Sequence, residues 1–256
     1  MPIGVLFEPT RIKRKAKAEA EAALIQAENQ IQINELQQRA LHRLLVEETK
    51  KQENIENISH QSFKDIKESA RPENIDDDWL SNFFDKCKNI SNEDMQKYWS
   101  KLLSDEANAP GSISKRTIET FYMMDKNDAD LYTKLLSFGW MLGTQLTIMI
   151  DDLKNNIFTK SGIDFSSLIH LEDIGLIKFN GISGYKRVGF PKRIGIYYYG
   201  NPITIEFNQD KDNELEIGSV LLTKVGIELS EIANSKMDVE YFEYMKDKLS
   251  KKVKVI

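Results

Sequence analysis

Residues 18–51 contain neither glycine nor proline, and this stretch constrains the fold more than any other part of the sequence. It is rich in Ala, Glu, Gln and Leu, which all favour helix. Its apolar positions alternate in spacings of four and three residues, which is typical of a coiled coil. We therefore predict an N-terminal helix of about 40 residues, on the order of 60 Å long, that assembles into a homo-oligomer. The residues expected at this contact are Ala20, Leu24, Ala27, Ile31, Leu41 and Leu45.

A second apolar stripe runs along the same predicted helix, through Ile33, Leu36, Ala40 and Leu44. Two stripes on one helix indicate two packing partners. The alternative to self-association is a hairpin with the next helix of the same chain. That second helix is expected to pass through Ile55, Ile66 and Ala70 and to stop before Pro72, because proline cannot continue a helix.

Short helices joined by tight turns are predicted from residue 76 to about residue 138. Asp76, Asp77 and Asp78 begin the first of them, where acids suit the positive end of the helix dipole, and we interpret them as helix-start residues and not as a metal site. Ser91 and Asp94 resemble a capping box for the next helix. The aromatic residues of this segment lie at the spacing of a core.

The pattern changes after Gly139, where short apolar or alternating segments separated by Gly, Pro, Asn and Asp indicate strands. We predict a mainly α protein with a C-terminal α+β part, divided into segments 1–72, 73–140 and 141–256. A helix at 166–174, strands, and a further helix after residue 222 follow the order of a winged-helix domain. Such domains use a β-wing near the phosphate backbone of nucleic acid.

Five cations fall in or near this predicted wing: Lys178, Lys186, Arg187, Lys192 and Arg193. They make nucleic-acid binding a hypothesis, with the steep salt dependence that phosphate contacts produce. The candidate recognition helix carries His170, Glu172 and Asp173 and no Arg or Lys, which opposes insertion into a groove. The alternative is a wing that serves as a scaffold or protein contact.

A basic cluster lies near the start of the chain, beside the short apolar segment IGVLF at residues 3–7. Together they indicate weak peripheral contact with anionic lipid or another anion, and the alternative is a solvated helix start. The cluster consists of Arg11, Lys13, Arg14, Lys15 and Lys17. No apolar run reaches the 18 or so residues of a spanning helix, and the order of apolar and basic residues is reversed from a secretory signal. We expect a cytoplasmic protein.

Several chemistries are disfavoured by composition. With 35 basic and 40 acidic residues the net charge is −5, which argues against a surface coated for indiscriminate nucleic-acid binding. Cys87 is the only cysteine and lies on an apolar helix face, which predicts a buried thiol and not a nucleophile. The three histidines lack metal-ligand spacing, and no phosphate loop or nucleophile elbow occurs. The sequence therefore predicts no catalytic residue, no metal site and no cofactor.

Residues 98–138 carry a specific pattern that includes Trp99, Leu102-Leu103, Glu106, Pro110-Gly111, Ser114, Arg116-Thr117 and Asp128-Ala129. This pattern resembles an uncharacterised bacterial family of unknown function, related to the abortive-infection alpha-type proteins. The segments LEDIGLI and LTKVGIEL also fit it. The resemblance implies a helical body with a winged-helix-like tail and a link to phage defence, and it carries over no catalytic residue.

Within this motif, Trp99, Glu106, Pro110, Gly111 and Arg116 are interpreted as structural. Arg116 is expected to clamp two helices by pairing with Glu106 or Asp105, and the alternative is a ligand-sensing arginine.

Three functions follow as hypotheses. The first is a non-enzymatic, oligomeric interaction protein that acts as a sensor or effector in anti-phage defence through a protein partner or membrane. The second is a winged-helix regulator that binds nucleic acid. The third and weakest is a nuclease or other enzyme with an unrecognised site, for which Asp76 to Asp78 are the residues to test.

Overall fold

The computed structural model describes residues 15–25 and 35–255. The chain divides into two compact units, with the boundary after Glu119, inside helix α5 (Lys115–Met123). The first unit is helical, and the second combines helices with antiparallel strands. The predicted fold class, mainly α with a C-terminal α+β part, is confirmed at this level. The three-part division at residues 72 and 140 stays a prediction.

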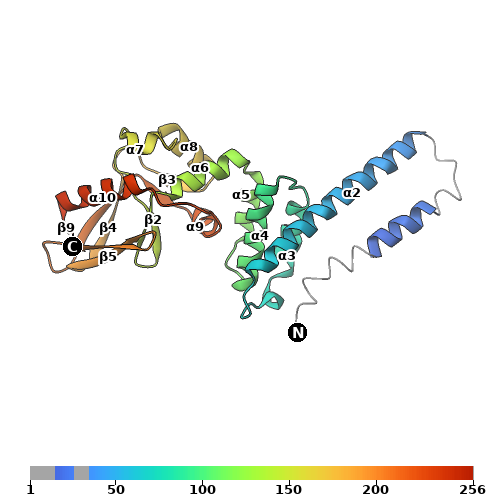
Figure 1. The fold of residues 1–256 in the computed structure, drawn as a ribbon, viewed down its shortest axis with the longest axis horizontal. Helices are drawn as coiled ribbons and strands as arrows, with labels where there is room; N and C mark the ends of the chain where they lie inside the picture. The colour runs from blue at the N-terminus through green and yellow to red at the C-terminus, as the bar shows by residue number, and fades with distance from the viewer. Residues whose placement is uncertain (1–14, 26–34, 256) are drawn as a thin grey trace. The chain divides into compact units, whose positions relative to one another are not determined.

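The first unit is built around the long helix α2 (Glu35–Ser62). It is followed by the short helical turns η1 (Phe63–Asp65) and η2 (Pro72–Asn74), by α3 (Asp77–Cys87) and α4 (Glu93–Asn108), and by the first half of α5. Figure 1 shows that the N-terminal half of α2 extends beyond α3 and α4. A separate helix covers residues 15–25.

The predicted helix boundaries around residue 50 and residue 70 are wrong. The structure has one continuous helix from Glu35 to Ser62, because nothing in this segment interrupts helix propensity. It ends earlier than predicted, because the Asn108 side chain takes over the backbone groups that follow. Its amide donates to the Asp65 carbonyl (2.9 Å) and its oxygen accepts from the Lys67 amide (2.9 Å). Ala27 and Ile31 lie outside the described residues.

Side-chain caps define the starts of the short helices in this unit. Asp76 caps α3 by accepting from the Trp79 amide (2.8 Å), as the predicted helix start requires. The cap of α4 is Asn92, which accepts from the Met95 amide (3.0 Å), so the predicted capping residue Ser91 is wrong by one position.

The core of the first unit is aromatic. The Trp79 ring stacks on Phe83 with 5.2 Å between centroids, and Phe83 meets Trp99 edge-on at 5.3 Å. All three side chains are buried, as is Ile58 of α2. The core prediction for these aromatics is therefore confirmed, and α2 is attached to it through its C-terminal half.

The second unit contains five helices and nine strands among its described residues. It begins with α6 (Lys126–Leu136), which is followed by a β-hairpin, two helices, six strands, two further helices and a last short strand. The hairpin is β1 (Gly139–Leu142) and β2 (Gln145–Ile148), and the helices are α7 (Asn156–Thr159), α8 (Phe165–Asp173), α9 (Lys224–Ser230) and α10 (Val239–Lys252). The remaining strands are β3 (Ile177–Phe179), β4 (Tyr185–Phe190), β5 (Arg193–Tyr198), β6 (Asn201–Glu206), β7 (Asn213–Gly218), β8 (Val220–Leu222) and β9 (Lys254–Val255).

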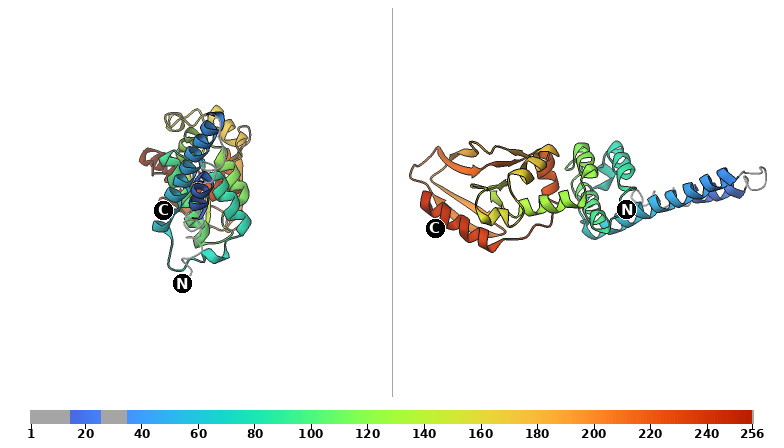
Figure 2. Two further views of the ribbon diagram at one scale, coloured as in Figure 1. Left: turned by 90° about the vertical axis from the view of Figure 1, so that its right-hand side faces the viewer. Right: turned by 90° about the horizontal axis from the view of Figure 1, so that it is seen from above.

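These strands form three antiparallel groups: a five-stranded sheet in the order β2-β1-β5-β6-β9 and the pairs β3-β8 and β4-β7. Helix α10 lies along the larger sheet (Figure 2). The rings of Trp140 on β1 and Tyr198 on β5 stack on Phe242 of α10, at 5.9 Å and 5.6 Å between centroids.

Helix α10 buries Met245 and Leu249, whereas Val239 at its start is 65% exposed. The fully buried residue of its first turn is Tyr241. Its hydroxyl receives the Trp140 indole N–H (2.9 Å) and donates to the Met149 carbonyl (2.8 Å). A tyrosine can be buried here because its polar end is hydrogen-bonded.

The segment that suggested a winged helix has the expected order of α8, β3, β8 and α9, and α8 ends at Gly175 (φ +84°) as predicted. Strand β3 pairs with β8 in antiparallel register. Four strands, β4 to β7, lie between these two in the sequence, which is more than a simple two-stranded wing. The winged-helix assignment stays a proposal.

Candidate functional site

One side of helix α2 is covered in the C-terminal half and uncovered in the N-terminal half, where it is apolar. In the C-terminal half, Asn54, Ile58 and Ser62 are buried against the body of the unit. Leu36, Ala40 and Leu44 each precede one of these by 18 residues, which is about five full helical turns. They therefore project from the same side of the helix, but Leu36 is 67% and Leu44 51% exposed.

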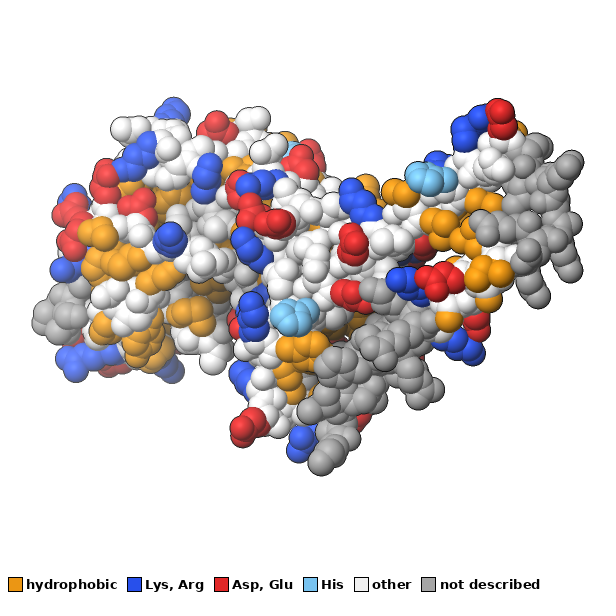
Figure 3. Space-filling model, turned by 45° about the vertical axis from the view of Figure 1, so that its right-hand side comes forward, with side chains coloured by type: hydrophobic (Ala, Val, Ile, Leu, Met, Phe, Trp, Pro, Cys, Tyr) orange, Lys and Arg blue, Asp and Glu red, His pale blue; other side chains and the backbone are white. Residues whose placement is uncertain are grey.

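Two of the predicted contact residues widen this uncovered surface. Leu45 is 38% exposed and Leu41 is half-buried. We call Leu36, Ala40, Leu41, Leu44 and Leu45 the open face of α2. Figure 3 shows apolar side chains gathered on the surface of this helix. Of the other predicted contact residues, Ala20 is exposed and Leu24 half-buried in the helix at 15–25.

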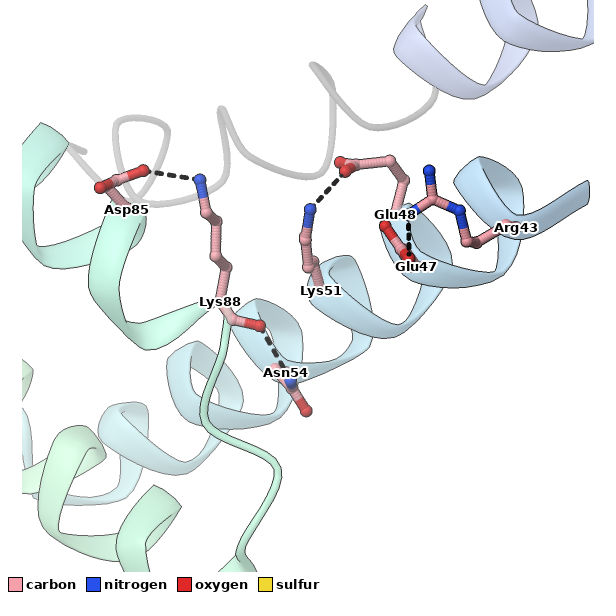
Figure 4. Close-up of polar contacts among 7 residues, drawn as sticks. All are labelled: Arg43, Glu47, Glu48, Lys51, Asn54, Asp85 and Lys88. Carbon is pink, nitrogen blue, oxygen red and sulfur yellow. Dashed lines mark hydrogen bonds and ion pairs between the residues drawn. The ribbon is translucent and has the colours of Figure 1, made fainter. Parts of the chain in front are cut away.

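A polar belt of Glu47, Glu48 and Lys51 lies between the open face and the buried half of the helix (Figure 4). Arg43 donates to Glu47 (3.0 Å), and Lys51 donates to Glu48 (2.7 Å). One turn further on, the buried Asn54 amide donates to the Lys88 carbonyl (2.8 Å). Gln96 donates to the Asn54 oxygen (3.1 Å), so this amide joins α2 to α4 and to the turn between α3 and α4.

The Pro-Gly motif is a turn that a buried carboxylate holds closed. Pro110 and Gly111 occupy its two central positions, and Gly111 has φ +86°, as a type II turn requires. The Glu106 carboxylate is buried and accepts from the backbone amides of Gly111 (2.6 Å) and Ile113 (2.8 Å). This role could have been read from an acid placed a few residues before a Pro-Gly pair.

The predicted clamp from Arg116 to Glu106 or Asp105 is wrong. Glu106 is occupied by the turn, and Asp105 pairs with Lys101 (2.9 Å). The Arg116 side chain is exposed. Elsewhere in the motif, Asp128 forms a capping box with Asp125 and accepts His170 at 2.6 Å, which ties α6 to α8.

Most cations of the predicted wing already have partners. Three form ion pairs: Lys186 with Glu214 (3.4 Å), Lys192 with Asp210 (2.8 Å) and Arg193 with Glu206 (3.1 Å). Arg187 donates to the Leu142 carbonyl (3.4 Å) and lies over the Phe190 ring. Lys178 is exposed on β3, whereas the other four cations lie on β4, on β5 or in the turn between these two strands. Nucleic-acid binding through these residues stays a prediction, and the pairing lowers the positive charge that it needs.

One family model matches this chain. The model of a family described as "Protein of unknown function (DUF2806)" matches residues 38–246, which is most of the chain. The chain belongs to the DUF2806 family. Neither curated proteins nor solved structures gave a match. The predicted family of unknown function is confirmed, and the link to abortive-infection proteins stays a proposal.

The DUF2806 match includes the buried half of α2, most of its open face, the Pro-Gly turn and the wing cations. It does not include the predicted basic cluster. Arg11, Lys13 and Arg14 lie outside the described residues, and Lys15 and Lys17 are exposed, with Lys15 3.8 Å from Glu19. Among residues 15–25 and 35–255, no helix combines the length and apolar character that crossing a bilayer requires.

The described part of this DUF2806 chain contains no cluster of three or more His, Cys, Asp or Glu side chains that could hold a metal ion. The predicted burial of Cys87 is confirmed, and burial raises the pKa of its thiol far above the usual range. A thiolate nucleophile is therefore disfavoured at this position. The open face of α2 is the candidate functional site, because it is the predicted interaction surface that the structure leaves uncovered.

Proposed function

We propose that this DUF2806 protein is a non-enzymatic interaction protein that self-associates, with the open face of α2 as the contact between two copies. The observation that supports this most directly is the 18-residue repeat of one helix face, buried in one half and exposed in the other. Removing a leucine side chain from water stabilises an assembly by roughly 1.5–3 kcal/mol. Two copies that cover Leu36, Leu44 and Leu45 on each other gain a fraction of this for each leucine.

The charges beside the open face favour a second copy over a partner of one charge sign. Glu35 pairs with Arg39 (3.5 Å) and Arg43 with Glu47 (3.0 Å), so both signs flank the face. These two acids and two bases cancel, so the face offers no net charge that would attract a strongly acidic or strongly basic partner. The coiled coil is part of the proposal.

The biological role that we propose is that of a sensor or effector in bacterial anti-phage defence, in the cytoplasm, where assembly is the active event. The support is the resemblance of residues 98–138 to proteins related to the abortive-infection alpha type. A winged-helix regulator that binds nucleic acid has weaker support, because most of the wing cations are paired.

Light scattering on the full chain tests self-association with a matched pair of variants. Leu44→Asp places a charge on the open face. Val46→Asp makes the same kind of change two residues along, about 200° around the helix, at a side chain that is equally exposed (56% against 51%). We expect an oligomeric wild type, a monomeric or strongly weakened Leu44→Asp and an oligomeric Val46→Asp. A monomeric wild type, or equal loss in both variants, would refute the proposal.

The same variants test the defence role. Bacteria that express the wild type or Val46→Asp should give fewer plaques with a sensitive phage than bacteria that express Leu44→Asp. Equal plaque counts for all three across a panel of phages would refute the role while leaving self-association intact.

A further inference from the structure

A cleft with a volume of about 410 Å³ lies in the second unit, between the end of β2, the β4–β7 pair and α10. This size falls at the lower end of small-molecule sites, which are about 300–1,000 Å³. Its wall combines apolar side chains with two acids and two lysines. The apolar members include Met149, Leu215, Met245 and Leu249, and the charged members are Asp151, Lys186, Glu216 and Lys248.

Asp151 is the unusual group in this wall. Its Oδ2 accepts from the Tyr244 hydroxyl (2.7 Å) and pairs with Lys248. Its Oδ1 is buried and has no hydrogen-bond partner among the described residues. The whole side chain is only 17% exposed, so water gives this oxygen little compensation. Leaving a buried acceptor unsatisfied is unfavourable. A donor brought by a ligand into the cleft removes this deficit.

Rigid elements hold this carboxylate in place. The Ser219 amide donates to the Ile150 carbonyl (2.9 Å), directly before Asp151 in the chain. Gly218 (φ +94°) makes this approach possible, since a Cβ there would lie 1.9 Å from the Ile150 oxygen. Tyr244 and Lys248 lie one turn apart on α10 and therefore face Asp151 together.

The charges of the wall indicate which ligand chemistry fits. Lys248 is paired with Asp151, and Lys186 lies 3.4 Å from Glu214 and 4.0 Å from Glu216. The cations therefore have acidic neighbours, whereas Asp151 Oδ1 lacks a donor. We propose that the cleft binds a small amphipathic molecule whose amine or amide N–H donates to Asp151 Oδ1 and whose apolar part packs between Met149 and Met245.

Methionine-methyl NMR on the full chain tests this proposal with three probes of the same apolar length: hexylamine, hexan-1-ol and hexanoate. Met149 and Met245 line the cleft, whereas Met123 and Met141, which are exposed, do not. We expect saturable shifts of the two cleft methyl signals, tightest with hexylamine, weaker with hexan-1-ol and absent with hexanoate. No saturable shift, tighter binding of hexanoate, or equal shifts of Met123 and Met141 would overturn the proposal.

A matched pair of variants then tests the carboxylate itself. Asp151→Asn should weaken hexylamine binding on the order of tenfold, since the acceptor loses its negative charge and a hydrogen bond to a neutral group is weaker. Asp152→Asn is the control, because the neighbouring Asp152 is exposed, lies outside the cleft wall and caps the Lys154 amide (2.9 Å). Unchanged hexylamine affinity in a folded Asp151→Asn protein, or equal loss in both variants, would also overturn the proposal.

Discussion

In the C-terminal half of α2, Asn54, Ile58 and Ser62 pack into the body of the first unit, whereas in the N-terminal half Leu36, Ala40 and Leu44 occupy the same side of the helix and remain exposed. The two halves share a helix face but differ in what contributes to their stability. Most helical stability in proteins comes from tertiary packing. The buried half has this packing, while the open half depends on helix propensity, on side-chain pairs such as Arg43–Glu47 and on continuity with the anchored half.

This difference explains how one helix serves two purposes. The part of this side that is buried in the monomer fixes the fold. The part that is left open is available to a second copy. The polar belt of Glu47, Glu48 and Lys51 marks the change between them. If the two halves of α2 have these separate roles, a substitution in the buried half affects folding, and an equivalent substitution in the open half affects assembly.

The largest effect on the free energy of unfolding is expected from shortening one side chain in the buried half of α2. Ile58→Ala should lower the free energy of unfolding by about 2–5 kcal/mol, because it leaves a cavity in the core. Leu44→Ala should change it by less than about 0.5 kcal/mol in dilute protein, since Leu44 is half exposed. Urea unfolding at low protein concentration measures both. Equal losses would mean that the open face is covered within the monomer.

A smaller effect is expected at the border between the halves. Asn54→Ala removes a buried amide that donates to the Lys88 carbonyl and accepts from Gln96, and should lower the free energy of unfolding by about 1–3 kcal/mol. Asn57→Ala is the control, since Asn57 is exposed on the same helix and carries the same change in helix propensity. If both variants unfold alike, Asn54 does not anchor α2, and the boundary of the covered half lies further along the helix.

The sequence predicted the helices of the first unit because their signals are local. The acids before Trp79 predicted the start of α3, and aromatic spacing predicted the core around Trp99. The end of α2 depends instead on Asn108, which lies more than forty residues away and replaces the backbone partners of Asp65 and Lys67. Such a long-range contact has no signature near residue 62, so the helix was placed too far along the chain.

Long-range contacts also limited the prediction of the candidate sites. Periodicity predicted an apolar stripe at Leu41 and Leu45, but only the structure shows which part of the face the body covers. The wing cations were visible as a cluster in sequence, whereas their acidic partners, such as Glu214 for Lys186, come from other strands. Asp151 was missed because it belongs to no motif. Its local signal is only an acid directly after the apolar segment 146–150, and Tyr244 and Lys248 contact it from α10, more than ninety residues later in the chain.

The smallest effect is expected from the polar belt itself, where Lys51 donates to Glu48 (2.7 Å) and this hydrogen bond raises the pKa of the Lys51 ammonium. A raised pKa in the folded state means that the folded protein holds this proton more tightly than the unfolded chain. The stabilisation is therefore complete below the usual lysine pKa of about 10.4 and is lost as the pH rises through the higher folded value.

Thermal unfolding of wild type and Lys51→Met across this alkaline range measures the effect as a difference, so that titration common to both proteins cancels. We expect the wild type to lose its small advantage as Lys51 deprotonates. The exposed neighbour Lys50, for which the described residues show no ion pair, provides the control variant Lys50→Met, whose difference from wild type should stay constant with pH. A pH-independent difference for Lys51→Met would show that the Glu48–Lys51 pair does not stabilise the border, since surface pairs often contribute little. The change from covered to open face would then rest on the Asn54 contacts alone.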